Sequence, residues 1–430
     1  MELTLLGTAA PEGLPRPGCP CAGCATSVGA HARAATAVLV DGVLLLDATP
    51  DAGAGAARAG HAPSGIRHVL PARPAEDSPA GAQLPGLPQA GRVPAGQQLV
   101  AASGHRVRAV AVDVPGTGYA VTGPDGTRAL YLPPGAAPAE PTEPTEAAGP
   151  SGPAAPLPGN RNGDGDGDSD GEDVDRPYDV VLADVLGRPE ALARLRASGA
   201  VGPGTDVIAV HLDHDDPLGA ELARRCVAAG ARAVPDGTAV LTGRPVPAPT
   251  VPRRTLVVGG TRSGKSLQAE RRLEAHPDVV YAATGGGRDG NPDWVHRVHL
   301  HRERRPAHWR TVETRDLIPL LTEDGPPLLV DCLASWLADA MERIDAGDDT
   351  AWLGGGQQKL RAQSVELAAA VRAARRRVVL VSSEVGSGVE PGTVRQRRYR
   401  DELGWLNAAV AGTCEEVLLV VAGQVLPLKG

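Results

Sequence analysis

The chain has 430 residues, which is enough for two or three domains. A formal net charge of −8 and few aromatic residues, none of them Phe, argue against a nucleic-acid-binding protein. Because no apolar run is long enough to span a membrane and no signal-peptide pattern is present, we expect a cytoplasmic protein without a transmembrane segment.

The first part of the chain, up to about residue 134, is rich in β-strand patterns. Apolar runs at 36–40 and 43–47 flank Asp41-Gly42, which predicts a hairpin with a type I′ turn. Further strands are predicted at residues 66–70, 105–112 and 127–132.

Residues 135–176 have a different composition, since Pro, Ala and Glu repeats lead into GDGDGDSDGED with almost nothing apolar to bury. This composition predicts a disordered acidic insertion. Asp166, Asp168 and Asp170, followed by Gly171, resemble the start of a calcium loop, but Pro177 stands where that loop requires Glu. Calcium binding is therefore not predicted.

From Tyr178 onwards strand and helix patterns alternate. The predicted strands are 178–184, 206–212 and 238–241, and the predicted helices are 190–197 and 218–229. The Pro-rich stretch PVPAPTVP at 245–252 is predicted to be a linker, so we expect one domain at 1–244 and a second at 253–430.

The second domain again alternates strands and helices. Its predicted strands are 255–258, 279–283, 326–331, 377–383 and 415–423, and its predicted helices lie near 267–273, 292–304, 333–345, 357–376 and 396–412. This order predicts an α/β fold with a mostly parallel sheet and crossover helices.

The stretch GGTRSGKS, residues 259–266, fits the pattern G-x-x-x-x-G-K-[ST] between a strand and a helix. Such a loop directs backbone N–H groups at phosphate oxygens, while Lys265 would reach the β/γ-phosphates and Ser266 would ligate Mg²⁺. Only three lysines occur in the chain, and one of them falls at the required position. A P-loop that binds a nucleoside triphosphate is predicted.

Two further features accompany the P-loop. Asp331 ends a buried-strand pattern, as a Walker B carboxylate does, although a strand-end Asp can also cap the following helix. His296, His299, His301 and His308 cluster among arginines, which is compatible with a zinc site, a solvated basic helix face, or an imidazole that attacks phosphorus.

The segment from about 255 to 429 resembles the adenosylcobinamide kinase/adenosylcobinamide-phosphate guanylyltransferase family, whose members are P-loop NTPases with a RecA-like sheet. The resemblance is carried by VVGGTRSGKS (257–266), YAAT (281–284), RVHLHRERRPAHWRT (297–311), LLVDCLASW (328–336), VLVSSEVGSGVEP (379–391) and YRDELGWLNAAVA (399–411).

The resemblance implies that His301, five residues before Pro306, carries a covalent GMP, with His299 as the close alternative because Leu300 replaces the family's frequent second His. It also implies nucleotide contacts by Gly259, Gly260, Thr261, Arg262, Ser263, Gly264, Lys265, Ser266, Thr284, Gly285, Gly286, Arg302, Glu303, Arg304, Arg305, Glu313 and Asp331. The family more often has Glu at position 331.

The activity that the resemblance implies is bifunctional. An NTP, either ATP or GTP, would phosphorylate adenosylcobinamide with Mg²⁺, and GMP would then pass from GTP through His301 to give adenosyl-GDP-cobinamide. No catalytic metal is predicted beyond the Mg²⁺ that accompanies the nucleotide. The family resemblance also implies a homo-oligomer. A P-loop kinase for another small alcohol and a nucleotide-dependent regulatory module are the alternatives.

The N-terminal half resembles the phosphodiesterase-like branch of the metallo-β-lactamase fold through MELTLLGTAAP, CPCAGC, AVLVDGVLLLDATPD and DVIAVHLDHDDP. Its H-x-H-x-D-H signature is absent, because the chain has PARPAED at 71–77, so a structural or substrate-docking domain is expected. Cys19, Cys21 and Cys24 are compatible with a structural zinc completed by His211, His214 or Cys226, or with plain reduced thiols.

Overall fold

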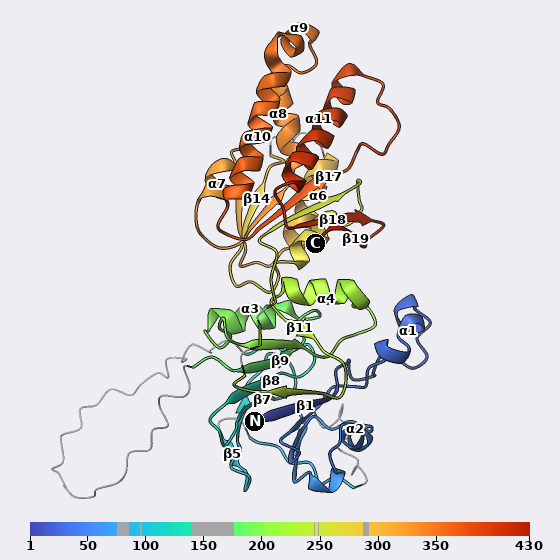
Figure 1. The fold of residues 1–430 in the computed structure, drawn as a ribbon, viewed down its shortest axis with the longest axis vertical. Coiled ribbons are helices and arrows are strands. Elements are labelled where there is room, and N and C mark those ends of the chain that lie inside the picture. Colours follow the sequence, from blue (N-terminus) through green and yellow to red (C-terminus); the bar gives the residue numbers. More distant parts are fainter. Residues whose placement is uncertain (75–85, 95–96, 140–175, 245, 248, 287–291) are drawn as a thin grey trace, which may run out of the picture.

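A computed structural model of the protein describes residues 1–74, 86–94, 97–139, 176–244, 246–247, 249–286 and 292–430. The described chain contains two β-sheets in its N-terminal part, residues 1–244, and one in its C-terminal part, residues 253–430 (Figure 1). None of the helices in the described ranges is long and apolar enough to cross a membrane.

The N-terminal part is a sandwich of two sheets with helices outside. The first sheet has the order β12 (Thr238–Leu241), β1 (Glu2–Gly7), β2 (Ala37–Val40), β3 (Leu44–Leu46), β4 (His68–Leu70). The second has the order β11 (Arg232–Ala233), β10 (Asp206–Ala209), β9 (Val180–Ala183), β8 (Arg128–Tyr131), β7 (Gly118–Thr122), β6 (Arg106–Val110), β5 (Gln98–Val100).

The inner faces of these sheets share one buried core. Leu5 and Val38 of the first sheet and Tyr131 and Ile208 of the second belong to the same hydrophobic cluster. The outer faces are covered by α2 (Ala52–Arg58) on the first sheet and by α3 (Pro189–Ala197) and α4 (Gly219–Ala228) on the second. This layering confirms the predicted αβ/βα architecture.

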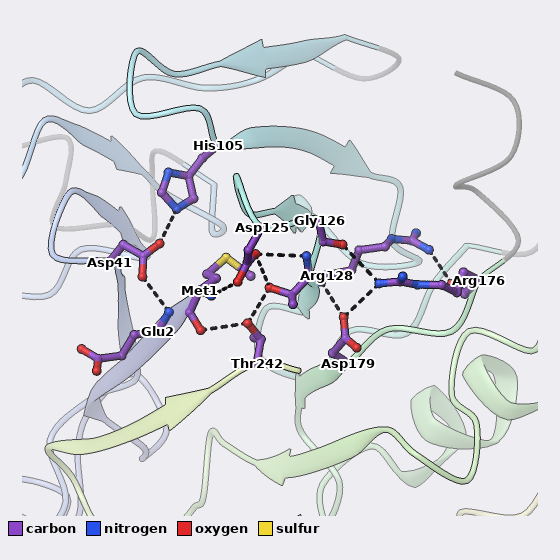
Figure 2. Close-up of polar contacts among 11 residues, drawn as sticks. Met1, Glu2, Asp41, His105, Asp125, Gly126, Arg128, Arg176, Asp179 and Thr242 are labelled. Atoms are coloured by element: carbon purple, nitrogen blue, oxygen red, sulfur yellow. Dashed lines mark hydrogen bonds and ion pairs between the residues drawn. The ribbon is translucent and has the colours of Figure 1, made fainter. Parts of the chain in front are cut away.

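The predicted hairpin is present and its turn takes part in a polar seam between the sheets. Asp41 and Gly42 have φ values of 45° and 70°, as a type I′ turn requires. The Asp41 carboxylate accepts hydrogen bonds from the Glu2 amide (2.6 Å) and from His105 Nε2 (2.8 Å), while the Met1 amino group pairs with Asp125 (Figure 2). These contacts tie β1 to the loops of the second sheet.

The predicted insertion at 135–176 begins too early. Ala136 and Ala137 are fully buried, and Ala137 accepts a hydrogen bond from the Asp113 amide, so residues 135–139 belong to the folded part. Arg176 pairs with Asp179 at 3.3 Å on the other side (Figure 2). Residues 140–175, including the calcium-like stretch, lie outside the described residues.

The C-terminal part is built on one mostly parallel sheet. Its order is β15 (Arg310–Glu313), β14 (Val280–Ala283), β16 (Leu328–Asp331), β17 (Val378–Ser383), β13 (Arg254–Gly259), β18 (Glu416–Val421), β19 (Gln424–Lys429). Only β18 and β19 pair antiparallel, because Ala422 and Gly423 turn the chain with φ values of 50° and 78°. The single strand predicted at 415–423 was therefore wrong at its end.

Helices cover both faces of this sheet (Figure 1). One face holds α5 (Lys265–Arg271), to which α6 (Pro292–Arg304) is tied by an ion pair between Arg304 and Glu270. The other face holds α7 (Ile318–Thr322), α8 (Leu333–Arg343), α10 (Gln357–Ala373) and α11 (Val394–Ala411). Two short helical segments, α9 (Asp349–Ala351) and η4 (Trp352–Gly356), connect α8 to α10. The doubly covered parallel sheet confirms the predicted α/β class.

Candidate nucleotide site

The P-loop connects the end of β13 to the start of α5, in the context that the sequence predicted. Two of its glycines are required by geometry. A side chain at Gly259 would lie 2.5 Å from Val420 O and Ser263 Oγ, and Gly264 has a φ of 95°. Lys265 Nζ donates to Gly260 O at 3.1 Å, so the lysine side chain folds over the loop.

The loop lies at one end of a cavity of about 960 Å³ at the carboxyl ends of the parallel strands, where α/β sheets commonly bind ligands. Thr261, Lys265 and Ser266 contribute to its lining. Other predicted site residues that line the same cavity are Gly285, Gly286, His301, Arg302, Arg305, Glu313 and Asp331. The fold therefore brings residues from five separate segments to one cavity.

Asp331 ends β16 and points into this cavity with its side chain only 12% exposed. The Tyr281 hydroxyl donates to Asp331 Oδ2 at 2.8 Å. Burial, followed by the charge of Asp331, raises the pKa of Tyr281 well above its usual value, so this hydroxyl remains a donor at neutral pH. The carboxylate is thus held in a fixed orientation at the cavity wall.

Three of the four histidines of the basic segment have distinct surroundings in the structure. His301 is 29% exposed, lines the cavity, and places Nδ1 3.8 Å from Asp331 Oδ2. His299 also lines the cavity, but it is 65% exposed and pairs with Glu303 one helical turn away at 3.1 Å. His308 lies after α6 against the His276 carbonyl at 3.4 Å. Only His301 lies against Asp331.

The arginines of this segment also have different partners. Arg305 stacks its guanidinium over the Tyr281 ring at 3.8 Å and donates to the His301 carbonyl at 2.9 Å, so it supports the cavity wall. Arg302 pairs with Glu313 at 2.5 Å at the cavity edge. Arg304 instead forms two hydrogen bonds with the buried Glu270 of α5, at 2.6 and 2.8 Å.

Eight of the predicted contact residues do not line the cavity: Gly259, Gly260, Arg262, Ser263, Gly264, Thr284, Glu303 and Arg304. The Thr284 hydroxyl donates to the Cys332 carbonyl at 2.7 Å and accepts from the Cys332 amide at 2.8 Å, so it joins the ends of β14 and β16. Arg304 faces α5, and the exposed Glu303 pairs with His299. Thr284 and Arg304 therefore hold together the elements that surround the cavity.

The structure adds lining residues that sequence reasoning missed. They come from α8 and from the start of α11 and include Ser335, Ala338, Gln396 and Tyr399, together with Ser383 at the end of β17. Small and polar residues on amphipathic helices carry no distinctive motif, so only their position in the fold identifies them. In the sequence, the stretches at 328–336 and 399–411 that carry the family resemblance pointed to this part of the site.

A second candidate site lies in the N-terminal part. The ligand atoms of Cys19, Cys21, Cys24 and His214 all lie within 4.8 Å of one another, and this is the one group of three or more possible metal ligands among the described residues. His214 Nδ1 is 3.4 Å from Cys21 Sγ and 3.7 Å from Cys19 Sγ. Such separations suit ligands of a tetrahedral zinc ion with bonds of about 2.0–2.3 Å.

The structure thereby selects among the predicted fourth ligands. His211 is buried and its Nε2 lies 3.0 Å from the Leu132 carbonyl, while Cys226 lies on the buried face of α4 and belongs to the core. The Cys24 backbone amide and then His214 lower the pKa of Cys21 to about 6, which favours the thiolate that binds zinc. The four side chains fit a structural zinc.

The position of the missing H-x-H-x-D-H signature begins directly after β4. There Arg73 pairs with the buried Asp47 at 3.4 Å, and the Tyr131 hydroxyl donates to the same carboxylate at 3.1 Å. Burial raises the pKa of Asp47, and Arg73 opposes this shift. Residues 75–77 of the altered motif lie outside the described residues.

Comparison with known proteins gives the following matches. The family model for cobinamide kinase/cobinamide phosphate guanyltransferase matches residues 255–428. The bifunctional adenosylcobalamin biosynthesis protein CobP of Pseudomonas aeruginosa is 42% identical over 182 residues, which cover 41% of this chain and 98% of that protein. The bifunctional adenosylcobalamin biosynthesis protein CobU of Salmonella typhimurium is 34% identical over 180 residues, 40% of this chain and 98% of that protein.

Solved structures of low sequence identity match the remaining part. A diphosphatase from the PhnP family is 18% identical, with 56% of this chain and 96% of that chain covered and a TM-score of 0.37. Zinc-bound PqqB from Methylobacterium extorquens is 16% identical, with 56% and 100% covered and a TM-score of 0.38.

Proposed function

The chain belongs to the cobinamide kinase/cobinamide phosphate guanyltransferase family through residues 255–428, and we propose that the cavity beside its P-loop performs both reactions. The enzyme is a bifunctional transferase of cobalamin biosynthesis that uses nucleoside triphosphates. The observation that carries the residue-level proposal is that His301 lines the same cavity as Lys265 and Ser266 and lies 3.8 Å from Asp331, whereas His299, at the same cavity, is more exposed and pairs with Glu303. A nucleotide whose phosphates rest on the loop therefore lies within reach of the imidazole.

Groups from several segments would hold the nucleotide. Backbone N–H groups of residues 260–266 and the Lys265 ammonium would bind the phosphates, and Gly285, Gly286 and Glu313, which the family resemblance implies as nucleotide contacts, line the same cavity. The Ser266 hydroxyl and the Asp331 carboxylate offer the oxygen ligands that Mg²⁺ prefers, on one cavity wall. When bound, Mg²⁺ would neutralise charge on the phosphate oxygens.

In the kinase reaction the aminopropanol hydroxyl of adenosylcobinamide attacks the γ-phosphorus of ATP or GTP. A new O–P bond forms, the bond between the γ-phosphorus and the bridging oxygen breaks, NDP leaves, and the hydroxyl proton passes to solvent. Lys265 stabilises the charge that spreads over the transferring oxygens.

In the guanylyltransferase reaction neutral His301 attacks the α-phosphorus of GTP and expels pyrophosphate, which leaves GMP on nitrogen. A phosphate oxygen of adenosylcobinamide phosphate then attacks the same phosphorus, the N–P bond breaks, and His301 is restored. Tyr281 and Arg305 hold the wall against which the imidazole lies, so they act as positioning residues.

Replacing His301 with Ala should separate the two activities. We expect the variant to phosphorylate adenosylcobinamide and to accumulate adenosylcobinamide phosphate, while GMP transfer falls by about 10³-fold or more because the nucleophile is lost. Chromatography of the corrinoid products measures both steps. His299→Ala is the matched control and should retain both. Equal loss of kinase and transferase activity in His301→Ala would contradict the proposed division of roles.

The same proposal extends to the rest of the chain. Residues 253–430 would form the catalytic domain, 245–252 the linker, and 1–244 a domain without a catalytic metal, in which Arg73, after β4, pairs with Asp47, after β3. The expected cytoplasmic location and homo-oligomeric state are also proposals, which cell fractionation and light scattering would test.

A further inference from the structure

The cavity beside the P-loop extends onto both faces of the C-terminal sheet. On the face of α5 and α6 it is lined by residues such as His301 and Arg302. On the opposite face it continues between α8 and the start of α11, where Ala334, Ala338, Met341, Thr393, Gln396 and Tyr399 line it. We call this second region the α8–α11 lobe. The total volume of about 960 Å³ is at the upper end of small-molecule sites.

The α8 side of this lobe is an apolar floor made of small residues. Ala334, Ala338 and Met341 follow one another at intervals of four and three residues, so they share one face of the helix. The two alanines leave the space that a longer side chain would occupy. On the α11 side the Tyr399 hydroxyl donates to the Ala334 carbonyl at 3.2 Å, which fixes the distance between the two helices.

The rim of the lobe is polar. Arg395 and Glu342 form an ion pair at 3.0 Å across its opening, and their side chains are 54% and 65% exposed. Gln396, the third residue of α11, is exposed beside them. The rim therefore offers hydrogen-bond donors and acceptors around an apolar floor.

We propose that the α8–α11 lobe binds the corrinoid that accepts the phosphoryl and GMP groups. This inference rests on the function proposed above, which places the phosphates at the P-loop. The α8–α11 lobe belongs to the same cavity as Lys265 and Ser266, so an acceptor hydroxyl held in the lobe can reach the terminal phosphate. A corrin ring is a broad apolar macrocycle fringed with amides, which matches an apolar floor inside a polar rim.

The test fills the lobe with a bulky side chain. In Ala338→Trp we expect the KM for adenosylcobinamide to rise about tenfold or more in the kinase assay, because the indole occupies the floor. Covalent labelling by GTP carrying ³²P at its α-phosphate requires no corrinoid and should remain within about twofold of wild type. Ala408→Trp, at an exposed position of α11 outside the cavity, is the matched control and should change neither quantity.

A second variant, at the rim, tests the same inference if Ala338→Trp does not fold. Arg395→Ala removes an exposed ion pair of small structural value and should raise the corrinoid KM about threefold. Unchanged corrinoid KM in both variants would overturn the inference, as would loss of labelling together with corrinoid turnover in a folded Ala338→Trp protein. Absence of labelling in wild type would instead contradict the proposed function, and equilibrium dialysis with adenosylcobinamide would still test the lobe in wild type against Ala338→Trp.

Discussion

At the scale of single residues, Arg304 has a protein partner that its motif did not predict. The family resemblance implied a nucleotide contact, whereas its guanidinium forms a two-point ion pair with Glu270, whose side chain is 2% exposed. Burial raises the pKa of Glu270, and Arg304 counteracts that shift. The pair therefore joins α6, which carries His301, to α5, which begins at the P-loop lysine.

Replacing Arg304 with Met should lower the free energy of unfolding by about 1–3 kcal/mol, because it leaves the Glu270 carboxylate buried without its partner. Adding Glu270→Gln to the same chain removes that charge and should recover most of the loss, which a double-mutant cycle of thermal unfolding would measure. If the single and double variants unfolded at the same temperature, the pair would not be what joins the two helices.

Several site residues could be predicted from the sequence because their chemistry is tied to a motif. Lys265 and Ser266 follow from the P-loop pattern, and Asp331 follows from its place at a strand end. The choice of His301 over His299 came from the family resemblance, and the structure gives it a physical basis in burial and in the nearby Asp331. Thr284 could not be assigned correctly, since its hydroxyl partner is 48 residues away.

At the scale of elements, the Cys-rich loop is joined to a segment almost two hundred residues later. Cys19 and Cys21 precede the short α1 (Ala22–Thr26), Cys24 lies within it, and His214 lies between β10 and α4. A zinc ion bound here would cross-link the two loops at one end of the sandwich.

We expect about one zinc ion per chain in purified protein, because three thiolates and one imidazole form a closed tetrahedral set. Elemental analysis of wild type, Cys21→Ser and His214→Ala measures this, with His211→Ala as the control that should keep its zinc. Metal-free wild-type protein, or equal zinc in all four proteins, would exclude the site.

Long periodic elements were predicted well because packing follows hydrophobic periodicity. The predicted helix at 292–304 coincides with α6, and the predicted strand at 377–383 differs from β17 by one residue. Short elements were missed. β15 has the pattern exposed, exposed, half-buried, exposed, so it lacks the apolar signal of a buried strand, and its pairing with β14 is set by tertiary contacts.

At the scale of the whole molecule, the two parts meet through the layer formed by α3 and α4 (Figure 1). Ala275, which follows α5, joins the hydrophobic cluster of the N-terminal part. Arg377 donates to the Ala228 carbonyl at 2.7 Å and to His276 Nε2 at 3.0 Å. The sequence predicted the linker but gave no sign of this contact, because its residues belong to no motif.

This junction should be sensitive to acid. Burial and then Arg377 lower the pKa of His276 to about 3, so His276 stays neutral in the folded protein while it titrates near 6.5 when unfolded. The unfolded chain therefore binds more protons as the pH falls below about 6.5, and stability is lost progressively down to about pH 3. His276 alone should cost about 2 kcal/mol between pH 7 and pH 5.

The measurement is the thermal unfolding temperature of wild type and His276→Gln between pH 7 and pH 5. We expect a smaller decrease in the variant, since Gln does not titrate, and an unchanged decrease in the exposed-site control His31→Gln. Parallel curves for all three proteins would show that His276 is not buried at a formed junction.

Labelling with GTP that carries ³²P at its α-phosphate tests whether the cavity beside the P-loop contains a histidine that becomes covalently guanylylated. Wild type and His299→Ala should acquire label that is acid-labile and alkali-stable, as a phosphoramidate is, while His301→Ala and Lys265→Ala should not. Label that persisted in His301→Ala, or that disappeared in His299→Ala, would contradict the assignment of the nucleophile.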